Sequence, residues 1–346
     1  MRHALAFIKV VILTVAFAVA APVAAGAETP AAGSLERAAM PDGGDFAFLQ
    51  QEETRRLFRE AFQKLAAGPD HNPAAAVELG KRGFDQEPEN IKGQILYAEI
   101  LVRAGRVEDG LMLLREKSAA LPGESIYKTA IAQVYFSQQR DDEAYGYLNA
   151  EIEKTPEDFD LRVFRADSRL FVSSDFAIAE WDYRSLIDSR PADARLWTSL
   201  GFARFQQGKL LSAREAFTRA LEIQPGYVEA MNNLAWVDRK EEKYEEALRQ
   251  FDEVIRLKPD YRPAHLGRAY TLRDTGDLAG SIQAYKKLLE LDPNFILVLD
   301  MLVLYVRLYL WVIISLIVAG LFWFGRLYLR TIRRDRRKAE RALERR

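Results

Sequence analysis

Seven prolines divide this chain of 346 residues at almost equal intervals. They are Pro88, Pro122, Pro156, Pro191, Pro225, Pro259 and Pro293, and only the interval from Pro156 to Pro191 is longer than the rest, by a single residue. Their spacing matches the period of about 34 residues of a helix–turn–helix unit repeated in tandem. Because proline cannot continue a helix, each is expected to end the second helix of one unit before the next unit begins. The spacing therefore predicts an all-α fold of stacked helix pairs.

The clearest unit lies between two of these prolines, Pro191 and Pro225. Its characteristic residues are Trp197, Leu200, Gly201, Gly208, Ala213, Phe217 and Ala220. This set resembles the tetratricopeptide repeat pattern, in which large and small side chains alternate at helical spacing so that two helices pack closely. Arg204 departs from the pattern because it stands where the family has tyrosine. We expect its stem to pack and its charge to reach water.

The resemblance implies a superhelical solenoid of such units. Six tetratricopeptide repeats are predicted over residues 91–293, and a degenerate first repeat over 48–90, which lacks the aromatic and glycine signals of the others. Degenerate terminal repeats are common in solenoids. The extra residue of the long interval is expected in the turn between repeats near Asp158, because turns accept insertions most easily.

The N-terminal segment is predicted to lie outside the fold. Residues 1–27 have a basic start, an apolar run over 10–21 and the small residues Ala25, Gly26 and Ala27 at a cleavage position. This arrangement is typical of a secretory signal peptide. An uncleaved anchor helix is the alternative, although the apolar run is short for a span. Residues 28–47 are predicted to be a flexible lead-in.

The C-terminal segment carries a predicted transmembrane helix. Residues 308–325 contain no charged side chain, and at 1.5 Å per residue they extend about 27 Å, close to the thickness of the hydrocarbon layer. Aromatic residues flank both ends of the stretch, as in many membrane spans. Residues 294–307 are predicted to form a closing helix that packs on the last repeat and merges into the span.

Charge predicts the orientation of this span. Nine Arg and one Lys against three acidic residues give the tail 326–346 a net charge of 10 − 3 = +7. The positive-inside rule places such a tail in the cytoplasm. A signal peptide sends the repeats to the other side, so we expect a single-pass protein of a bacterial inner membrane with its repeats in the periplasm. The basic tail also suits contact with anionic lipid headgroups.

The repeat region itself is acidic. The whole chain has a formal charge of −1, and removing +7 in the tail and +2 in residues 1–27 leaves −10 for residues 28–325. A segment of this charge is not expected to bind nucleic acid. The chain also has no cysteine, so it has neither disulfides nor thiolate metal sites.

We expect no enzymatic activity, cofactor or metal. After cleavage of the signal peptide only His71 and His265 remain, more than five repeats apart. A solenoid unit contacts only its neighbours, so these two side chains cannot meet in a catalytic pair or a metal site. No glycine-rich phosphate loop follows a strand.

The resemblance also suggests a binding surface, because the first helices of tetratricopeptide repeats line a concave groove. The first residues of the six units are taken as Ile91, Ser125, Asp160, Ala194, Val228 and Arg262. On this count the predicted groove residues are Phe164, Phe171, Phe202, Phe205, Asn233, Trp236 and Tyr270.

Three of these residues depart from the family pattern. Phe202, Trp236 and Tyr270 occupy the ninth position of successive units, where a small residue is more common. Phe164 falls at a fifth position, and Phe171 and Phe205 fall at twelfth positions. Asn233 stands where some members have one residue of a carboxylate clamp, but the rest of the clamp is missing. We interpret the row formed by Phe202, Trp236 and Tyr270 as an apolar groove that binds a helix or an extended peptide. The alternative is that the rings fill a shallow core.

These observations predict a periplasmic scaffold that binds a partner protein beside the inner membrane, within an envelope assembly or export complex. The fold alone does not select the pathway. A carbohydrate-binding module is the alternative function, since rows of aromatic rings also stack on sugars of exopolysaccharides or cell-wall glycans.

Overall fold

The computed structural model describes residues 46–66, 71–291 and 295–343, and every regular element within them is a helix. Fourteen of these helices form seven successive pairs. The first helices of the pairs are α2 (Glu52–Leu65), α4 (Ile91–Arg103), α6 (Ser125–Ser137), α8 (Phe159–Phe171), α10 (Ala194–Gln206), α12 (Val228–Lys240) and α14 (Arg262–Asp274). The second helices are α3 (Pro73–Gln86), α5 (Val107–Ala120), α7 (Asp141–Lys154), α9 (Phe176–Ser189), α11 (Leu210–Ile223), α13 (Tyr244–Leu257) and α15 (Leu278–Leu291). The chain continues as α16 (Phe295–Leu343).

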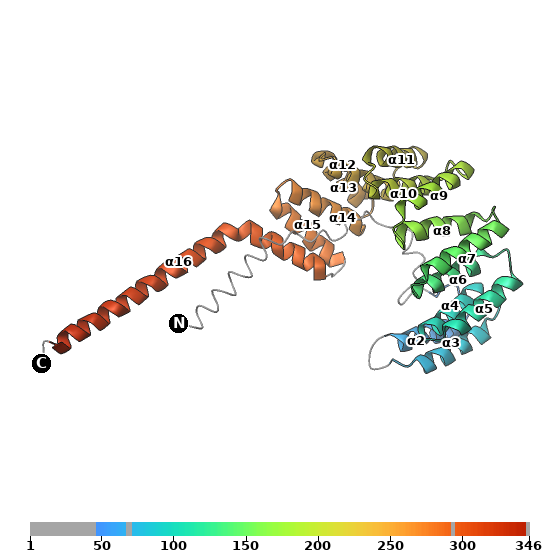
Figure 1. Ribbon diagram of the computed structural model, residues 1–346, viewed down its shortest axis with the longest axis horizontal. Coiled ribbons are helices and arrows are strands. Elements are labelled where there is room, and N and C mark those ends of the chain that lie inside the picture. The colour runs from blue at the N-terminus through green and yellow to red at the C-terminus, as the bar shows by residue number, and fades with distance from the viewer. Residues whose placement is uncertain (1–45, 67–70, 292–294, 344–346) are drawn as a thin grey trace. The chain divides into compact units, whose positions relative to one another are not determined.

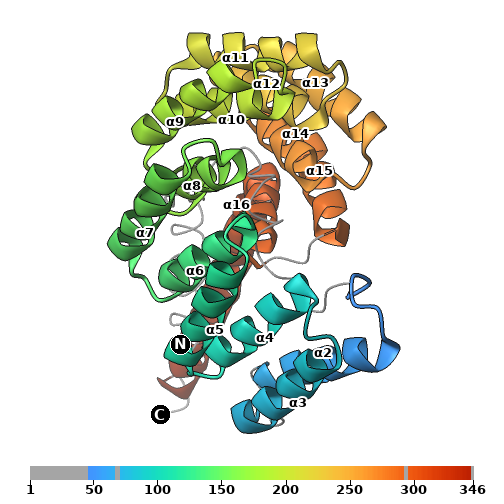
Figure 2. The same cartoon turned by 90° about the vertical axis from the view of Figure 1, so that its right-hand side faces the viewer.

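The helices belong to two compact units. One ends at Val237 and contains α2 to α11 and most of α12, and the other starts at Asp238 and contains α13 to α16. Within the first unit, consecutive helices pack on one another from α2 to α9, as both views show (Figures 1 and 2). This all-helical arrangement of tandem pairs confirms the predicted fold class.

The periodic prolines act as the spacing predicts. In the six repeats whose proline the structure describes, the second helix ends two residues before that proline. The residue between them has φ between −129° and −139° and ψ between 63° and 89°, at Glu87, Leu121, Thr155, Arg190, Gln224 and Lys258. A residue before proline is excluded from the helical region by the proline ring. Each proline therefore ends its helix through the residue that precedes it.

The extra residue of the long interval lies inside a repeat, so the prediction near Asp158 is wrong. Four residues, Val172–Asp175, join α8 to α9, whereas three residues join the helices of the other pairs from α4 to α15. Ser174 has φ of 55°, which turns the chain sharply. Asp158 instead caps α8, because its Oδ1 accepts from the Leu161 amide at 3.0 Å. The connection between α7 and α8 has four residues, 155–158, the same number as the connections between the other successive pairs from α3 to α14.

The first pair differs from the others in its turn. Seven residues separate α2 from α3, yet α3 begins at Pro73, one full period before the start of α5 at Val107. The second helix of this pair therefore follows the period of the other repeats, whereas its first helix does not. This difference explains the weak repeat signal over 48–90.

The predicted signal peptide, 1–27, lies outside the described residues, as does most of the predicted lead-in. The lead-in does not extend as far as predicted, because its end at 46–47 belongs to the fold. Phe46 is buried, and its ring stacks on that of Phe62 with centroids 6.2 Å apart. Leu49 lies in the same apolar cluster. In this cluster they pack with Phe58 on α2, Ala76 on α3 and Leu96 on α4.

Close packing of the helices depends on glycine at several places, and the contacts at Gly201 and Gly267 are the tightest of those between helices. A Cβ atom at Gly201 on α10 would lie 2.6 Å from the ring of Phe217 on α11. In the other unit, a Cβ atom at Gly267 on α14 would lie 2.2 Å from the ring of Phe251 on α13. Carbon atoms do not approach so closely, so each ring occupies the space that a side chain would need.

Helix α16 joins the last pair to an exposed apolar stretch. It is a single helix of 49 residues (Figure 1), so the predicted closing helix, 294–307, and the predicted span, 308–325, are parts of one element. Near its start, Tyr285 Oη donates to Asp300 Oδ2 at 3.4 Å, and Leu304 is buried. Farther along, Ile314–Arg334 is long and apolar enough to cross a membrane, with none of its residues buried. This stretch shares residues 314–325 with the predicted span.

Candidate functional site

The structure buries most of the predicted groove residues. Phe202, Phe205 and Tyr270 are 5–6% exposed, Asn233 is 2% exposed, and Trp236 has no exposed surface. Phe164 and Phe171 are half-buried. Trp236 can therefore reach a partner only if the protein rearranges. The burial fits the alternative in which these rings fill the core, and their contact with a partner stays a prediction.

The buried rings have specific neighbours. Phe202 stacks on Phe171 with centroids 5.6 Å apart and an angle of 29° between the rings. In the other unit, Tyr270 lies 6.2 Å from Tyr285 at 60°. Such offset and tilted pairs stabilise a core beyond the area that they bury. Both contacts join the first helix of a pair to another helix of the same compact unit. These rings therefore have a packing role.

Phe164 and Phe171 occupy positions other than those predicted. Because α8 begins at Phe159 and not at Asp160, they are the sixth and thirteenth residues of their helix. Val163 and Leu170 take the fifth and twelfth positions, and both are buried. Phe164 and Phe171 are seven residues apart and therefore lie on one face of α8. This face carries the half-exposed part of the predicted groove.

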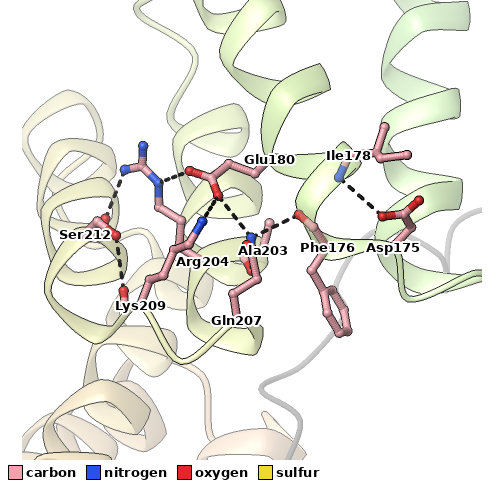
Figure 3. Close-up of polar contacts among 9 residues, drawn as sticks. All are labelled: Asp175, Phe176, Ile178, Glu180, Ala203, Arg204, Gln207, Lys209 and Ser212. Atoms are coloured by element: carbon pink, nitrogen blue, oxygen red, sulfur yellow. Dashed lines mark hydrogen bonds and ion pairs between the residues drawn. The ribbon is translucent and has the colours of Figure 1, made fainter.

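A polar cluster between α9 and the following pair was not predicted. Glu180 on α9 accepts from Arg204 Nε at 3.0 Å, from Gln207 Nε2 at 3.0 Å and from Lys209 Nζ at 2.8 Å (Figure 3). Arg204 also donates to the Ser212 carbonyl at 3.1 Å. The cluster joins the second helix of one pair to both helices of the next. Contrary to expectation, the charge of Arg204 is paired and does not simply reach water.

The environment of Glu180 favours its charged form. Burial raises its pKa, but the hydrogen bonds from Lys209, Arg204 and Gln207 outweigh that effect and lower the pKa to about 2. The side chain is 14% exposed, so water screens this interaction only in part. In the sequence, only the replacement of the pattern's tyrosine by Arg204 pointed to this cluster, and it did not indicate which carboxylate pairs with the arginine.

A second polar cluster replaces the usual apolar contacts between α8 and α9. Asp182 lies 2.6 Å from Arg165 Nη2 and 3.3 Å from Arg169 Nε, and Arg165 also donates to Asn149 on α7. Arg162 donates to Ser185 Oγ at 3.0 Å. These arginines stand at the fourth, seventh and eleventh positions, where the family pattern has Trp, Leu and Tyr. Burial raises the pKa of Asp182, although both arginines oppose the effect.

The fourth position of the first helix has a structural role in three repeats. Gln94, Trp197 and His265 stand there, and each hydrogen-bonds the carbonyl of the proline that ends the preceding repeat, at 2.6, 2.8 and 2.9 Å. A carbonyl only accepts, so His265 Nε2 carries a proton in this contact. The tryptophan of the pattern is thus both a packing residue and a donor. His265 therefore has a structural role in its repeat.

Within the described residues, no group of three or more His, Asp or Glu side chains is placed to hold a metal ion. His71 is exposed at the start of the second helix of the first pair. The arrangement as a whole offers helix faces, aromatic edges and paired charges.

Tandem helix pairs that recur at a constant period define a helical repeat protein. Residues 192–260 and residues 232–294 match the tetratricopeptide repeat family. Residues 192–294 are thus built of tetratricopeptide repeats, and repeats of this family generally bind other proteins.

Known proteins share the repeat region. A TPR repeat-containing protein of Pseudomonas aeruginosa is 23% identical over 63% of this chain and 34% of its own length. TPR repeat-containing protein YpiA of Bacillus subtilis is 24% identical over 61% of this chain and 50% of its own length. The chain thus spans half or less of these two relatives. The crystal structure of a tetratricopeptide repeat protein from Parabacteroides merdae superposes with a TM-score of 0.50, 14% identity and coverage of 72% of this chain and all of that one.

Proposed function

We propose that this chain is a single-pass inner-membrane protein whose repeats lie in the periplasm and hold a partner protein beside the membrane. The observation that carries the proposal is α16, which packs on the last pair and then continues through an exposed apolar stretch. Leu316, Phe322 and Trp323 are 68%, 72% and 65% exposed. A soluble monomer rarely exposes so large an apolar surface, whereas a bilayer would cover it.

Charge supports the orientation. Arg326, Arg330, Arg333 and Arg334 are exposed on α16 at the end of the apolar stretch. Basic residues beside a span favour the cytoplasmic side. The predicted signal peptide supports the same orientation, since it would carry the repeats across the membrane. The basic tail would then meet the anionic headgroups of the inner leaflet.

The half-exposed face of α8 is the proposed contact surface for the partner. Phe164 and Phe171 offer aromatic edges there, which suits a helix or an extended peptide of an envelope assembly or export complex. A glycan would need open ring faces. Phe202, Trp236 and Tyr270 are buried and do not offer them, so we do not favour carbohydrate binding.

Cysteine labelling would test the orientation, because the chain has no cysteine of its own. Leu211 is 72% exposed on α11, and Thr331 is exposed on α16, six residues beyond the end of the charge-free segment 308–325 that we take as the span. A Leu211→Cys variant is expected to react with a membrane-impermeant maleimide in intact spheroplasts. A Thr331→Cys variant is expected to react only after the membrane is permeabilised. The reverse pattern, or labelling of both sites before permeabilisation, would contradict the proposed topology.

Crosslinking would test the contact surface. A photo-reactive residue at Phe164 in the full chain is expected to form a protein adduct in the native membrane. Adding Phe171→Ala should weaken binding by about 2 kcal/mol, roughly thirtyfold in Kd, because truncation removes a neighbouring aromatic contact. Leu211→Ala removes a similar apolar side chain elsewhere and should leave the adduct yield unchanged. Equal yields from all three chains would exclude this face.

A further inference from the structure

A lysine of the last repeat lies beside the helix that carries the span. Lys286 is exposed on α15, and α15 packs on α16. The Nζ atom of Lys286 lies 5.6 Å from the centroid of the Tyr305 ring on α16. At this distance an ammonium group is attracted by the face of an aromatic ring. The ring therefore holds the charge of Lys286 against α16.

A second tyrosine supports this ring. Tyr309 follows Tyr305 by four residues, so the two side chains lie on one face of the helix. Their rings stack with centroids 6.2 Å apart and an angle of 12° between the planes. Tyr305 is half-buried, whereas Tyr309 is 48% exposed. Lys286, Tyr305 and Tyr309 thus form one group of side chains, the Lys286 cluster.

The charge of this cluster is not balanced. Among the described residues, no carboxylate lies within ion-pair distance of Lys286. Its neighbour Lys287 differs in this respect, because it pairs with Glu290 at 2.8 Å. Farther along α16, residues 301–325 contain no acidic side chain. The ammonium of Lys286 is therefore available to an anion from outside the protein.

The cluster lies at the level of the lipid headgroups. The charge-free segment 308–325 matches the hydrocarbon layer better than Ile314–Arg334, because four arginines stand near the end of the latter. The headgroup layer adds about 5–8 Å on each side of the hydrocarbon. Tyr305 precedes Leu308 by three residues, about 4.5 Å along the helix, and therefore falls within that layer. Arg307 adds a second basic residue at the same level of the chain.

We propose that the Lys286 cluster binds the phosphate of a phospholipid headgroup in the periplasmic leaflet of the inner membrane. The inference rests on the proposed function, because it takes residues 308–325 to span that membrane. A lysine ammonium binds phosphate as a point charge and needs no fixed geometry of donors. The contact ties α15, and with it the last pair, to the membrane surface in addition to the anchor that α16 provides.

The level of the cluster favours a lipid over a free anion. The bilayer concentrates phosphate groups at the height of Tyr305, and the acyl chains of the lipid can lie along the apolar part of α16 at the same time. Inorganic phosphate has no such second contact and would be held by charge alone. A bound lipid therefore gains from the charge of Lys286 and from the exposed apolar surface beyond it.

Lipid titration of the full chain in detergent would test the inference. With a fluorescent short-chain phosphatidylglycerol, Lys286→Gln is expected to raise Kd roughly fivefold, which corresponds to about 1 kcal/mol for one basic residue at the headgroups. Lys287→Gln is the matched control, because it removes the same charge from the next residue of α15, and it should change Kd much less. Equal Kd values for Lys286→Gln and the unchanged protein, or equal losses in the two variants, would overturn the inference.

Substitution of Tyr305 would test whether its ring holds the lysine. Tyr305→Leu removes the ring and should weaken lipid binding, whereas Tyr305→Phe keeps an aromatic face and should weaken it less. Adding Lys286→Gln to Tyr305→Leu should cause little further loss, because the two side chains act at one site. Fully additive losses, or equal effects of the leucine and phenylalanine variants, would overturn the inference. Circular dichroism of each variant checks that the helices are intact.

Two further measurements distinguish the other occupants. Inorganic phosphate at the same concentration as the lipid should not displace it, and displacement would identify a general anion site. In native membranes, a photo-reactive residue at Tyr309 should form adducts with phospholipid. If the adducts contain another protein or a second copy of this chain in place of lipid, the inference is wrong.

The proposed function is judged separately, through the labelling of Leu211→Cys and Thr331→Cys. If both sites react as expected and Lys286→Gln binds phosphatidylglycerol as tightly as the unchanged protein, the inference fails and the proposed function stands. If the labelling pattern is reversed, the proposed function fails whatever the titration shows. The inference then fails as well, because the cluster would face the cytoplasmic leaflet.

Discussion

Replacement of Trp236 by alanine is expected to lower the free energy of unfolding by about 3–5 kcal/mol, the usual cost of truncating a fully buried aromatic side chain. The indole has no exposed surface on α12, a first helix whose neighbouring residues Ala235 and Val237 are also fully buried. Truncation would leave a cavity that the packed helices cannot close. Urea denaturation of the full chain in detergent, followed by far-ultraviolet circular dichroism, would measure the loss.

This variant also separates the two interpretations of the ninth-position row. If Trp236 fills the core, the alanine variant loses stability first, and any loss of binding follows from that. Phe164→Ala is a matched control, because Phe164 is half-exposed and its truncation should cost much less stability. A Trp236→Ala variant with unchanged stability that no longer binds the partner would restore the groove interpretation.

The repeat period could be read from the sequence because a single local rule produces it. Each proline acts through the residue before it, and this effect needs no distant contact. The position of the extra residue could not be read in the same way. Asp158 and Val172 both lie in turns, and the cap that Asp158 provides appears only once the helix start is known. Because α8 begins one residue earlier than predicted, Phe164 and Phe171 lie on a different face of the helix from the predicted one.

The burial of the aromatic rings at the ninth position could not be predicted from the sequence either. Phe202 contacts Phe171, which belongs to the preceding repeat, so its exposure depends on how two repeats meet. The prediction of the closing helix depended less on contacts between different repeats. An apolar segment that starts in register after Pro293 and meets no further proline can simply continue as a helix, and α16 does so. The continuity of α16 followed from composition, whereas the neighbours of the side chains did not.

The Glu180 cluster was missed for a related reason. Arg204 stood out as a departure from the pattern, but its partner lies on the second helix of the preceding pair. An arginine at that position could have extended into water, as the sequence suggested. Packing α9 against α10 brings Glu180 within reach of Arg204 and makes pairing the better arrangement.

Glu180→Gln is expected to destabilise the protein at neutral pH by about 1–3 kcal/mol, somewhat less than the full shift of its pKa would imply, because Lys209 is half-exposed and water screens it. The folded-state pKa of about 2 lies below the ordinary value of 4.5. The contribution of the charged form is therefore fully present above about pH 5 and is lost as the pH falls toward 2. Thermal unfolding of both chains between pH 7 and pH 2 should show the difference narrowing over this range.

A matched control exists on another second helix. Glu253 pairs with Arg256 on the next turn of α13, and both side chains are well exposed. Glu253→Gln removes the same charge from a pair that joins no two helices, so it should change the unfolding temperature far less. If the two variants lose the same stability at every pH, the charge of Glu180 does not stabilise the contact between α9 and the next pair. If Glu180→Gln alone loses stability and the loss disappears in acid, the contact between α9 and the next pair depends on the charge of this carboxylate.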